Sequence, residues 1–486
     1  MEVGDQSGGS SRRSVKSPRV RAKRDTGLTP REREIAALVA KGFTNRSIAQ
    51  QLVISERTAE FHVEQIMNKL GFHSRAEVAA WVAQRSVLDV GEREPTSAVD
   101  EVKTPAAQTA PTRWRVPALA TLAGLIALAV VLAFAWWPRG SAISIQTIAG
   151  SGLRGTSDDV RTPTAADLTL VPGMAIDPAD DLYFVDGHRV RELTSNGKLM
   201  TIAGAADPGY SGDGGPAIAA RLNAPQGLAI GSDGSLYIAD MLNNCIRKVD
   251  QQGVISTVAG TAQAGYSGDG GPAALAQLNS PVGVAAGFGR VVYIADSANH
   301  RVRRIGSDGV IVTVAGTGEL GYAGDAGPAT SAPVGWPTGL AFDHKGNLYI
   351  ADAFNDRVRK LDLSGTITTV AGTGIRGYSG DQTRASLAQL SLAPGPPRSA
   401  GQALAVDTEG NLYIADTANQ RVRRVSVGGQ ITTVAGTGKA GYSGDGGPAS
   451  AAELNGPLAL AVDADDTLFI ADTENNRIRK LNDASR

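Results

Sequence analysis

A chain of 486 residues is too long for one ordinary domain and long enough to bury several hydrophobic cores. Its net charge of −1 divides unevenly: residues 1–115 hold 19 Lys and Arg against 14 Asp and Glu, whereas residues 139–486 hold 28 against 34. The single cysteine, Cys245, excludes an intrachain disulfide, and the charge distribution makes only the N-terminal part a plausible partner for a polyanion.

The chain opens with a basic segment, residues 1–26, in which Arg12 to Arg24 holds seven Lys and Arg and no acid. Clustered like charge with few apolar residues is typical of a disordered, solvated tail. The same cluster also suits contact with DNA or anionic lipid, and that alternative stays open.

Residues 27–88 predict a small all-α domain of four short helices. Thr29-Pro30 is a typical N-cap and first position of a helix. Asn45 is expected to cap a second helix over residues 46–52, and a third helix is expected to follow Ser55. Two short helices joined by a tight turn, the second amphipathic, predict a helix-turn-helix whose second helix enters the major groove of DNA.

This segment resembles the LuxR-type helix-turn-helix family. The resemblance implies transcriptional control by a homodimer on double-stranded DNA, with the final helix, Arg75 to Gln84, as the dimer contact. The residues that carry the resemblance are Leu28–Glu32, Gly42, Asn45, Ile48, Ala49, Leu52, Ile54, Ser55, Thr58, His62, Ile66, Lys69–Gly71, Ser74 and Arg75.

The expected DNA contacts depart from the family pattern at two positions. Glu60 and Glu64 stand where many relatives carry lysine, and a carboxylate cannot pair with phosphate, although it accepts from the cytosine N4 amine. Arg46, Arg57 and Lys69 are therefore expected to supply most of the attraction to the DNA backbone. A vestigial helix-turn-helix that serves as an interaction module remains the alternative. The full set of expected DNA-binding residues is Asn45, Arg46, Arg57, Thr58, Glu60, Phe61, Glu64, Gln65, Asn68 and Lys69.

Residues 89–115 predict a flexible linker and residues 116–138 a single transmembrane helix. Val116 to Trp137 are 22 residues without a charge, and such a helix is about 33 Å long, enough to cross a hydrocarbon core of about 30 Å. Basic residues gather on the N-terminal side of the span, so the positive-inside rule predicts a cytoplasmic N-terminus and an extracytoplasmic C-terminal domain at the cell inner membrane. A buried soluble helix is the alternative.

From residue 142 onward, one strand pattern recurs six times. Each copy predicts four short strands joined by glycine-bearing turns, the unit of a β-propeller blade. The outer strand is missing after the sixth copy, and a spare one, Ile143 to Gly150, is expected to complete that blade and close a six-bladed ring. The copies end their second strand, at intervals of 54, 56, 56, 64 and 56 residues, on Asp186, Asp240, Asp296, Asp352, Asp416 and Asp472.

The units resemble NHL repeats across residues 143–482, which implies a six-bladed propeller used mostly for binding. The carrying pattern is a Tyr-Ile-Ala-Asp strand followed by Asn and Arg. The first unit departs by losing two residues at Asp186–Arg189, and the second by placing Cys245 where the first Arg is expected. We interpret the recurrent carboxylates and guanidinium groups as scaffold pairs that fix each blade. They include Asp296 with Arg303, Asp352 with Arg359, Asp416 with Arg423, and Asp472 with Arg479.

A nearly identical loop, Gly209–Pro216 in one copy, precedes every unit but the first and is expected to decorate one face. Its near-identity also fits packing between blades. Its tyrosines, expected to ring that face, are Tyr210, Tyr266, Tyr322, Tyr378 and Tyr442. Specificity is expected where units differ, at His300, Trp336, Phe354 and residues 394–398. One carboxylate per loop falls short of the 6–8 oxygens that calcium takes, so neither a metal nor a cofactor is expected.

The sequence therefore predicts a multidomain chain: a small all-α helix-turn-helix domain, one transmembrane helix and an all-β six-bladed propeller. The expected function is a membrane-anchored bacterial transcriptional regulator whose propeller senses an unknown extracytoplasmic ligand or protein. No catalytic residue is expected. Two alternatives stay open: an extracytoplasmic propeller enzyme of the metal-dependent lyase or lactonase type, and a surface binding scaffold with a vestigial DNA-binding head.

Overall fold

The computed structural model describes two compact units of the chain, Met1–Val116 and Pro117–Arg486. The described residues are 30–52 except 42, nine scattered positions from 59 to 82 (59, 62, 63, 66, 67, 69, 72, 78 and 82), and 143–159, 162–392 and 401–482. No helix in these ranges is both long and apolar enough to cross a bilayer. The span expected at 116–138, the tail and the linker lie outside the described residues.

The smaller unit contains helices α1 (Pro30–Ala40) and α2 (Asn45–Leu52). The start of α1 at Pro30 confirms the prediction. The predicted cap of α2 is wrong by one residue, because Ser47 N donates to Thr44 Oγ1 at 3.2 Å and Ile48 N donates to Thr44 O at 2.9 Å. A threonine hydroxyl that accepts from the third helical N–H is the N-cap, so Asn45 is the first helical residue.

One hydrophobic core holds the smaller unit together. Ile35 on α1 and Ile48 on α2 are fully buried. Ala59, Val63 and Ile66 are helical and buried in the same core, and their spacing of four and three residues places them on one face of a helix. This arrangement agrees with an amphipathic third helix that packs against the first two.

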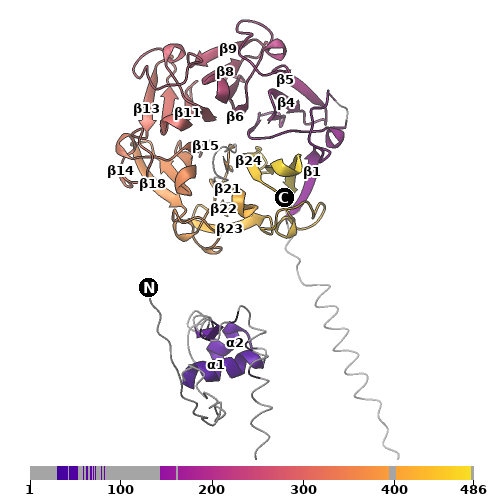
Figure 1. The fold of residues 1–486 in the computed structure, drawn as a ribbon, viewed down its shortest axis with the longest axis vertical. Coiled ribbons are helices and arrows are strands. Elements are labelled where there is room, and N and C mark those ends of the chain that lie inside the picture. Colours follow the sequence, from indigo (N-terminus) through magenta and orange to yellow (C-terminus); the bar gives the residue numbers. More distant parts are fainter. Residues whose placement is uncertain are drawn as a thin grey trace, which may run out of the picture. The chain divides into compact units, whose positions relative to one another are not determined.

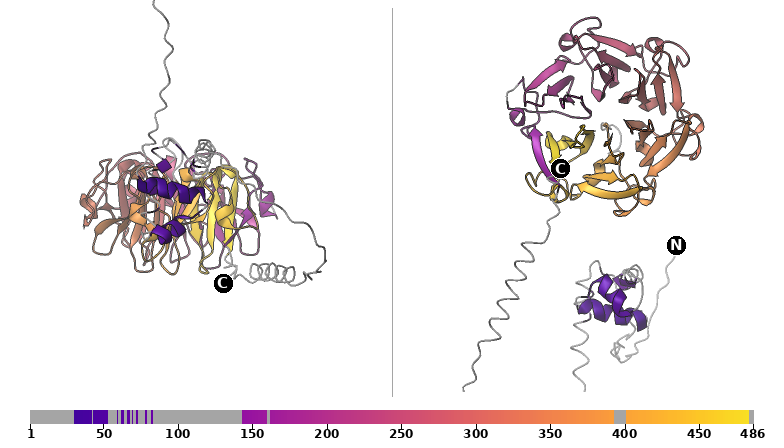
Figure 2. Two further views of the ribbon diagram at one scale, coloured as in Figure 1. Left: turned by 90° about the horizontal axis from the view of Figure 1, so that it is seen from below. Right: turned by 180° about the vertical axis from the view of Figure 1, so that it is seen from behind.

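The larger unit is a ring of six blades, each an antiparallel sheet of four strands or more (Figures 1 and 2). The six-bladed propeller predicted from the repeats is confirmed. In chain order and from the central channel outward, blade 1 contains β2 (Met174–Ile176), β3 (Leu182–Asp186), β4 (Arg189–Leu193) and β5 (Leu199–Ala203), and blade 2 contains β6 (Pro225–Ile230), β7 (Leu236–Asp240), β8 (Cys245–Val249) and β9 (Ile255–Ala259). Blade 3 contains β10 (Pro281–Ala286), β11 (Val292–Asp296), β12 (Arg301–Ile305) and β13 (Ile311–Ala315), and blade 4 contains β15 (Pro337–Phe342), β16 (Leu348–Asp352), β17 (Arg357–Leu361) and β18 (Thr366–Ala371). Blade 5 contains β20 (Leu404–Val406), β21 (Leu412–Asp416), β22 (Arg421–Val425) and β23 (Gln430–Ala435), and blade 6 contains β24 (Pro457–Val462), β25 (Leu468–Asp472) and β26 (Arg477–Asn482).

Strand β1 (Ser144–Ala149) closes the ring as predicted. It pairs antiparallel with β26, with Ser144 opposite Asn482 and Ile145 opposite Leu481. Ile145 is fully buried in the core shared by blades 5 and 6. The first strand of the repeat domain thus completes the last blade, and no disulfide is needed to hold the ends of the ring together.

The inserted loops cover the outer edges of the blades. In blade 2, Gly214 N donates to Ile255 O at 2.8 Å and Ile255 N donates to Gly215 O at 3.0 Å, so the loop adds to outer strand β9. In blades 4 and 5 the same pairing forms short fifth strands, β14 (Gly327–Pro328) and β19 (Thr383–Arg384). The loops were predicted to decorate one face; in the structure they also reach the perimeter, where they occupy exposed backbone groups of an edge strand.

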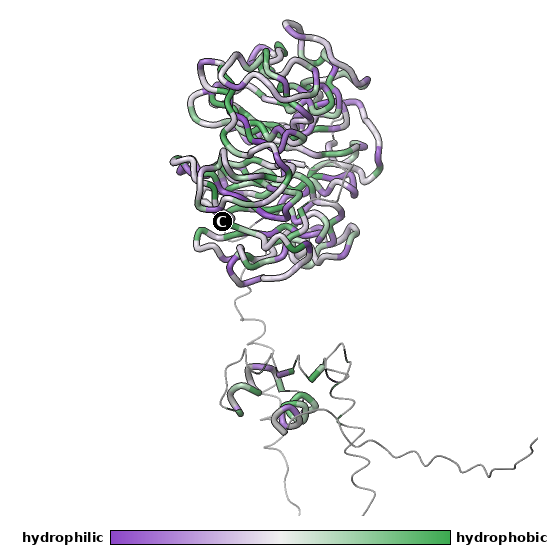
Figure 3. The backbone as a smooth tube through the Cα atoms, turned by 60° about the vertical axis from the view of Figure 1, so that its left-hand side comes forward, coloured by the Kyte–Doolittle hydropathy of each residue, from purple (hydrophilic) through white to green (hydrophobic). Residues whose placement is uncertain are grey.

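The propeller core lies between neighbouring blades. Each of its six hydrophobic clusters draws residues from two adjacent sheets; one cluster, for example, joins Val190 of blade 1 to Ile238 of blade 2. Hydrophobic and hydrophilic stretches alternate along the chain of the ring (Figure 3). Every blade is thus stabilised by contact with both neighbours, which makes closure by β1 important for all six.

We predict that weakening β1 destabilises the propeller as much as weakening a strand inside a blade. Ile145→Ala should lower the free energy of unfolding by about 2–5 kcal/mol, because it leaves a cavity in the core. Ile255→Ala, at the same position of β9, should cost a similar amount, whereas the exposed Gln146→Ala should stay within about 0.5 kcal/mol. Chemical denaturation of the full chain measures all three. A near-neutral Ile145→Ala beside a costly Ile255→Ala would mean that β1 does not close the ring.

Candidate functional site

A buried arginine organises each blade. In blade 3, the guanidinium group of Arg303 donates to the loop carboxylate Asp269 at 2.5 Å and to the carbonyl oxygens of Gln277 and Ser267 at 2.9 Å. Its Nη1 lies 3.7 Å from Asp296 Oδ2. The equivalent arginines are all fully buried, and each forms an ion pair with the aspartate that ends the second strand: Arg191, Arg247, Arg303, Arg359, Arg423 and Arg479.

The strand-end aspartate has further donors. Asp296 accepts from Asn299 Nδ2 and from the backbone N–H of Asn279, both at 2.8 Å. Burial raises the pKa of Asp296 to about 6, against the opposing effect of these hydrogen bonds and of Arg303. The aspartate, the arginine and the asparagine therefore fix the turn between the second and third strands.

The loop carboxylates show the opposite shift. Burial alone would raise the pKa of Asp269, but hydrogen bonds from Thr313 and Arg303, with a smaller one from Tyr266, outweigh it and leave the pKa below its usual value. Thr313 lies on the outer strand of the blade. Asp269 thus ties the loop to both the buried arginine and the outer edge.

The loop tyrosines have packing contacts. Tyr266 donates its hydroxyl to Asp269 at 2.9 Å, and the Arg301 guanidinium stacks on its ring at 3.8 Å. The same stack recurs at 3.6–3.9 Å in blades 4 to 6. Tyr210 has only the more distant buried arginine, Arg247 at 5.1 Å, because Cys245 replaces the stacking arginine. These contacts fit the packing interpretation, although the tyrosine residues are still 39–46% exposed; they are Tyr210, Tyr266, Tyr322, Tyr378 and Tyr442.

Three residues expected to set specificity lie at the boundary of blades 3 and 4. His300 Nδ1 accepts from the backbone N–H of Trp336 at 3.2 Å, and the two rings are 6.2 Å apart. Phe354 N donates to Gly335 O at 3.0 Å, and its side chain is exposed. Burial, then the charge of Arg301, lowers the pKa of His300. The fourth expected region, residues 394–398, lies outside the described residues.

The central channel is lined largely by apolar inner-strand residues such as Met174, Leu228 and Leu404. Gln402 of blade 5 contacts three other blades there: its N–H donates to Pro172 O at 2.8 Å, its Oε1 accepts from Leu228 N at 3.1 Å and its carbonyl accepts from Leu460 N at 3.2 Å. In the described ranges, no three His, Cys, Asp or Glu side chains lie close enough together to hold a metal ion.

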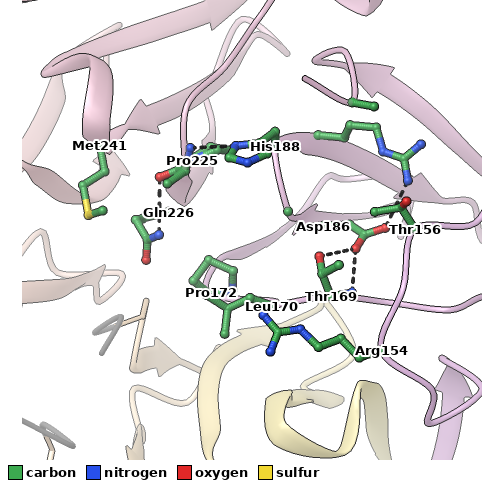
Figure 4. A pocket seen from close by; sticks show the side chains of 14 residues that line it. Arg154, Thr156, Thr169, Leu170, Pro172, Asp186, His188, Pro225, Gln226 and Met241 are labelled. Carbon is green, nitrogen blue, oxygen red and sulfur yellow. Dashed lines mark hydrogen bonds and ion pairs between the residues drawn. The ribbon is translucent and has the colours of Figure 1, made fainter. Parts of the chain in front are cut away.

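A cavity of about 300 Å³ lies between blades 1 and 2 (Figure 4). It opens where the first unit departs from the repeat. None of its residues was predicted as a site residue, although the loss of two residues at Asp186–Arg189 is a signal in the sequence that points to this place. Its lining includes Arg154, Thr156, Leu170, Pro172, His188, Arg189, Pro225, Gln226 and Met241.

One expected DNA contact has a structural partner. Lys69 Nζ donates to Glu32 Oε1 at 2.7 Å and to Oε2 at 2.9 Å, and Glu32 is nearly buried on α1. Asn45 is half-buried at the start of α2. The side chain of Arg46 lies outside what the structure describes, as do Arg57, Thr58, Glu60, Phe61, Glu64, Gln65 and Asn68.

We predict that removing one buried arginine is more damaging than removing a neighbouring exposed one. Arg303→Met should cost about 3–5 kcal/mol of unfolding free energy, because it leaves Asp296 buried without its cation. Arg304→Met, next in the strand and exposed, should stay within about 0.5 kcal/mol. Denaturant titration of the full chain compares the two. Equal, small losses would contradict a scaffold role for Arg303.

We also predict that Lys69 stabilises the small unit and contributes little to the salt dependence of DNA binding. Lys69→Gln should lower its thermal midpoint, whereas Lys41→Gln, at an exposed position, should not. A lysine that contacts phosphate contributes about 0.9 to the slope of log affinity against log salt concentration. A slope reduced by that amount in Lys69→Gln, with the midpoint unchanged, would show that Lys69 is a DNA contact instead.

Known protein families match each of the two units of the chain. A family model described as the Teneurin NHL domain matches residues 205–267 and 262–482, and one described as bacterial regulatory proteins, luxR family, matches residues 26–82. Teneurin-1 of Mus musculus is 30% identical over 279 residues, which cover 51% of this chain and 10% of that protein. Protein SUPPRESSOR OF QUENCHING 1, chloroplastic, of Arabidopsis thaliana is 30% identical over 276 residues, which cover 54% of this chain and 25% of that protein.

These relatives are much longer proteins, so the likeness extends to only a tenth to a quarter of their length. A solved structure of a protein of unknown function from Bacteroides thetaiotaomicron has a TM-score of 0.51 at 20% identity, covers 70% of this chain and 76% of its own, and shares the fold. The Teneurin NHL match spans more than half of the 486 residues. The chain therefore belongs to the Teneurin NHL domain family, and its N-terminal region carries a helix-turn-helix domain of the luxR family.

Proposed function

We propose that the chain is a membrane-anchored transcriptional regulator in which the propeller senses a ligand or partner and the helix-turn-helix domain acts on DNA. The observation that carries the proposal is the union of these two units in one chain. A luxR-family domain supports DNA binding, and a closed propeller supports recognition. Joining them makes a receptor with its own transcriptional output.

The membrane anchor is supported by the sequence between the units. Val116 to Trp137 contains no charge, with Arg113 and Arg115 before it and Arg139 after it. An apolar helix of this length spans a bilayer, and the basic residues favour a cytoplasmic N-terminus. We therefore place the helix-turn-helix domain in the cytoplasm, the span in the inner membrane and the propeller outside it.

In this proposal, ligand binding to the propeller regulates transcription by shifting a conformational or association equilibrium of the chain. A ligand shifts a monomer–dimer or orientational equilibrium only by the difference between its affinities for the two states. A homodimer on DNA, as in proteins of the luxR type, is the state that such a ligand would favour or oppose.

A binding role for the propeller is supported by how its charged groups are used. The buried arginines and strand-end aspartates are bonded to one another and to the loops, and the loop tyrosines are stacked under arginines. Groups committed to the scaffold in this way are poor candidates for acid–base chemistry. We therefore propose a non-enzymatic sensor.

The proposal predicts that the propeller governs where or when the chain binds DNA. Genome-wide DNA occupancy of the full chain should differ from that of a soluble fragment of residues 1–113, because only the full chain reports the state of the propeller. A full chain carrying Glu60→Ala and Glu64→Ala serves as a comparison for altered base recognition. Equal occupancy by the full chain and the fragment would contradict gating by the propeller. No specific occupancy by either would contradict a DNA-binding output.

A further inference from the structure

Blade 1 departs from the repeat at two positions that meet in space. In blade 3, the ring of Tyr266 lies under Arg301, and Asn299 on a short 3-10 helix donates to Gly265 O at 2.7 Å. Blade 1 has Thr156 at the tyrosine position and lacks the 3-10 helix, because its turn is two residues shorter. The equivalence of Thr156 and Tyr266 follows from the bridges two residues earlier, Arg154 with Leu168 and Ala264 with Leu278.

The two departures remove bulk from the same place. Without the asparagine, Asp186 takes hydrogen bonds from the N–H and hydroxyl of Thr169, both at 2.8 Å. Without the tyrosine, no aromatic ring covers Arg189, which instead donates to Ser157 O at 3.1 Å. The cavity of about 300 Å³ that remains lies at the lower end of the range of small-molecule sites, about 300–1,000 Å³.

An unsatisfied acceptor lies in the wall of this cavity. Gln226 is 2% exposed, and its Oε1 is the only buried side-chain oxygen without a hydrogen-bond partner in the described part of the chain. Its Nε2 makes one long contact, 3.4 Å, to Ala224 O. A buried polar atom without a partner is costly, so an N–H or O–H group supplied by a ligand would be favoured there. Figure 4 shows Gln226 between Met241 and Pro172.

Donors line the same cavity. His188 Nδ1 accepts from Ala224 N at 3.1 Å, so a neutral His188 carries its proton on Nε2 and is a donor there. Arg154 is exposed at the mouth and Arg189 lies within. The lining contains these two guanidinium groups and one carboxylate, Asp186, which lies 3.7 Å from Arg189 and 3.4 Å from Arg191, so Arg154 has no carboxylate of the lining as its ion-pair partner. The excess of positive charge favours an anion.

We propose that this cavity binds a small organic carboxylate that also carries an N–H or O–H donor and a short apolar portion. The carboxylate would meet Arg154, Arg189 and His188, and the donor would meet Gln226 Oε1. The apolar portion would pack among Leu170, Pro172, Pro225 and Met241. The inference rests on the proposed function only in treating the bound carboxylate as a signal; the binding itself needs neither DNA nor a membrane.

Hippurate has each of these groups: a carboxylate, an amide N–H and a phenyl ring. Isothermal titration of the detergent-purified full chain should detect hippurate binding, and its neutral amide, hippuramide, should bind at least about tenfold more weakly. Gln226→Leu, which keeps the size of the side chain and removes the acceptor, should weaken hippurate at least about tenfold, or 1.4 kcal/mol. Thr156→Tyr, which restores the residue of the other blades at an exposed position, should abolish binding.

The matched control is Thr338→Val, because Thr338 is the blade 4 counterpart of Gln226 and is equally buried. It should leave the affinity within twofold of wild type, and far-UV circular dichroism should show all three variants folded. The proposal is overturned if hippurate, N-acetyl-L-phenylalanine and 4-hydroxyphenyllactate all fail to bind at millimolar concentration. It is also overturned if hippurate binds Thr156→Tyr as tightly as wild type. Either result would contradict the ligand site but not the proposed DNA-binding regulator. Loss of DNA occupancy would contradict the regulator but not the ligand site.

Discussion

The propeller depends on one buried guanidinium group in each blade. Arg303 and its five counterparts are fully buried, and a charge buried in this way needs an anion and carbonyl oxygens around it. The sequence supplies them from three separate places: the end of the second strand, the inserted loop and the segment before the inner strand. The arginine therefore sets the course of the loop, and the loop in turn covers the outer edge of the blade.

This group of a buried arginine, a strand-end aspartate and a loop carboxylate recurs in all six blades, so most of the propeller is committed to building the ring. We propose that recognition takes place where the units differ. Blade 1 keeps the buried arginine and its carboxylates, with Arg191 beside Asp186 and Asp159. It lacks the tyrosine ring and the asparagine that surround this arginine in the other blades. The loss costs packing, and it leaves a cavity with an unsatisfied oxygen on Gln226. In the proposed sensor the irregular blade therefore holds the ligand site, since the regular positions are explained by the scaffold.

Much of the fold could be predicted from the sequence because its signals are periodic. The spacing of the strand-end aspartates predicted six blades, and the spare strand at Ile143 to Gly150 predicted the closure. The features that were predicted wrongly or not at all have physical causes. Thr44 and Asn45 are both good helix caps, and only geometry decides between them. The path of the loops depends on hydrogen bonds of Gly214 and Gly215 to a strand about 40 residues later. The partnership of Lys69 with Glu32 and the cavity at Gln226 arise from tertiary contacts without a local pattern.

We propose that the DNA-binding domain and the sensing propeller lie on opposite sides of one membrane. Paired reporter fusions at the C-terminus test this placement most directly, since alkaline phosphatase is active only outside the cytoplasm and green fluorescent protein folds well only within it. We expect an active phosphatase fusion and a dark fluorescent fusion at the C-terminus, with the opposite pattern at the N-terminus. Fluorescence at both ends would put the two units in the same compartment and contradict a regulator that signals across the membrane.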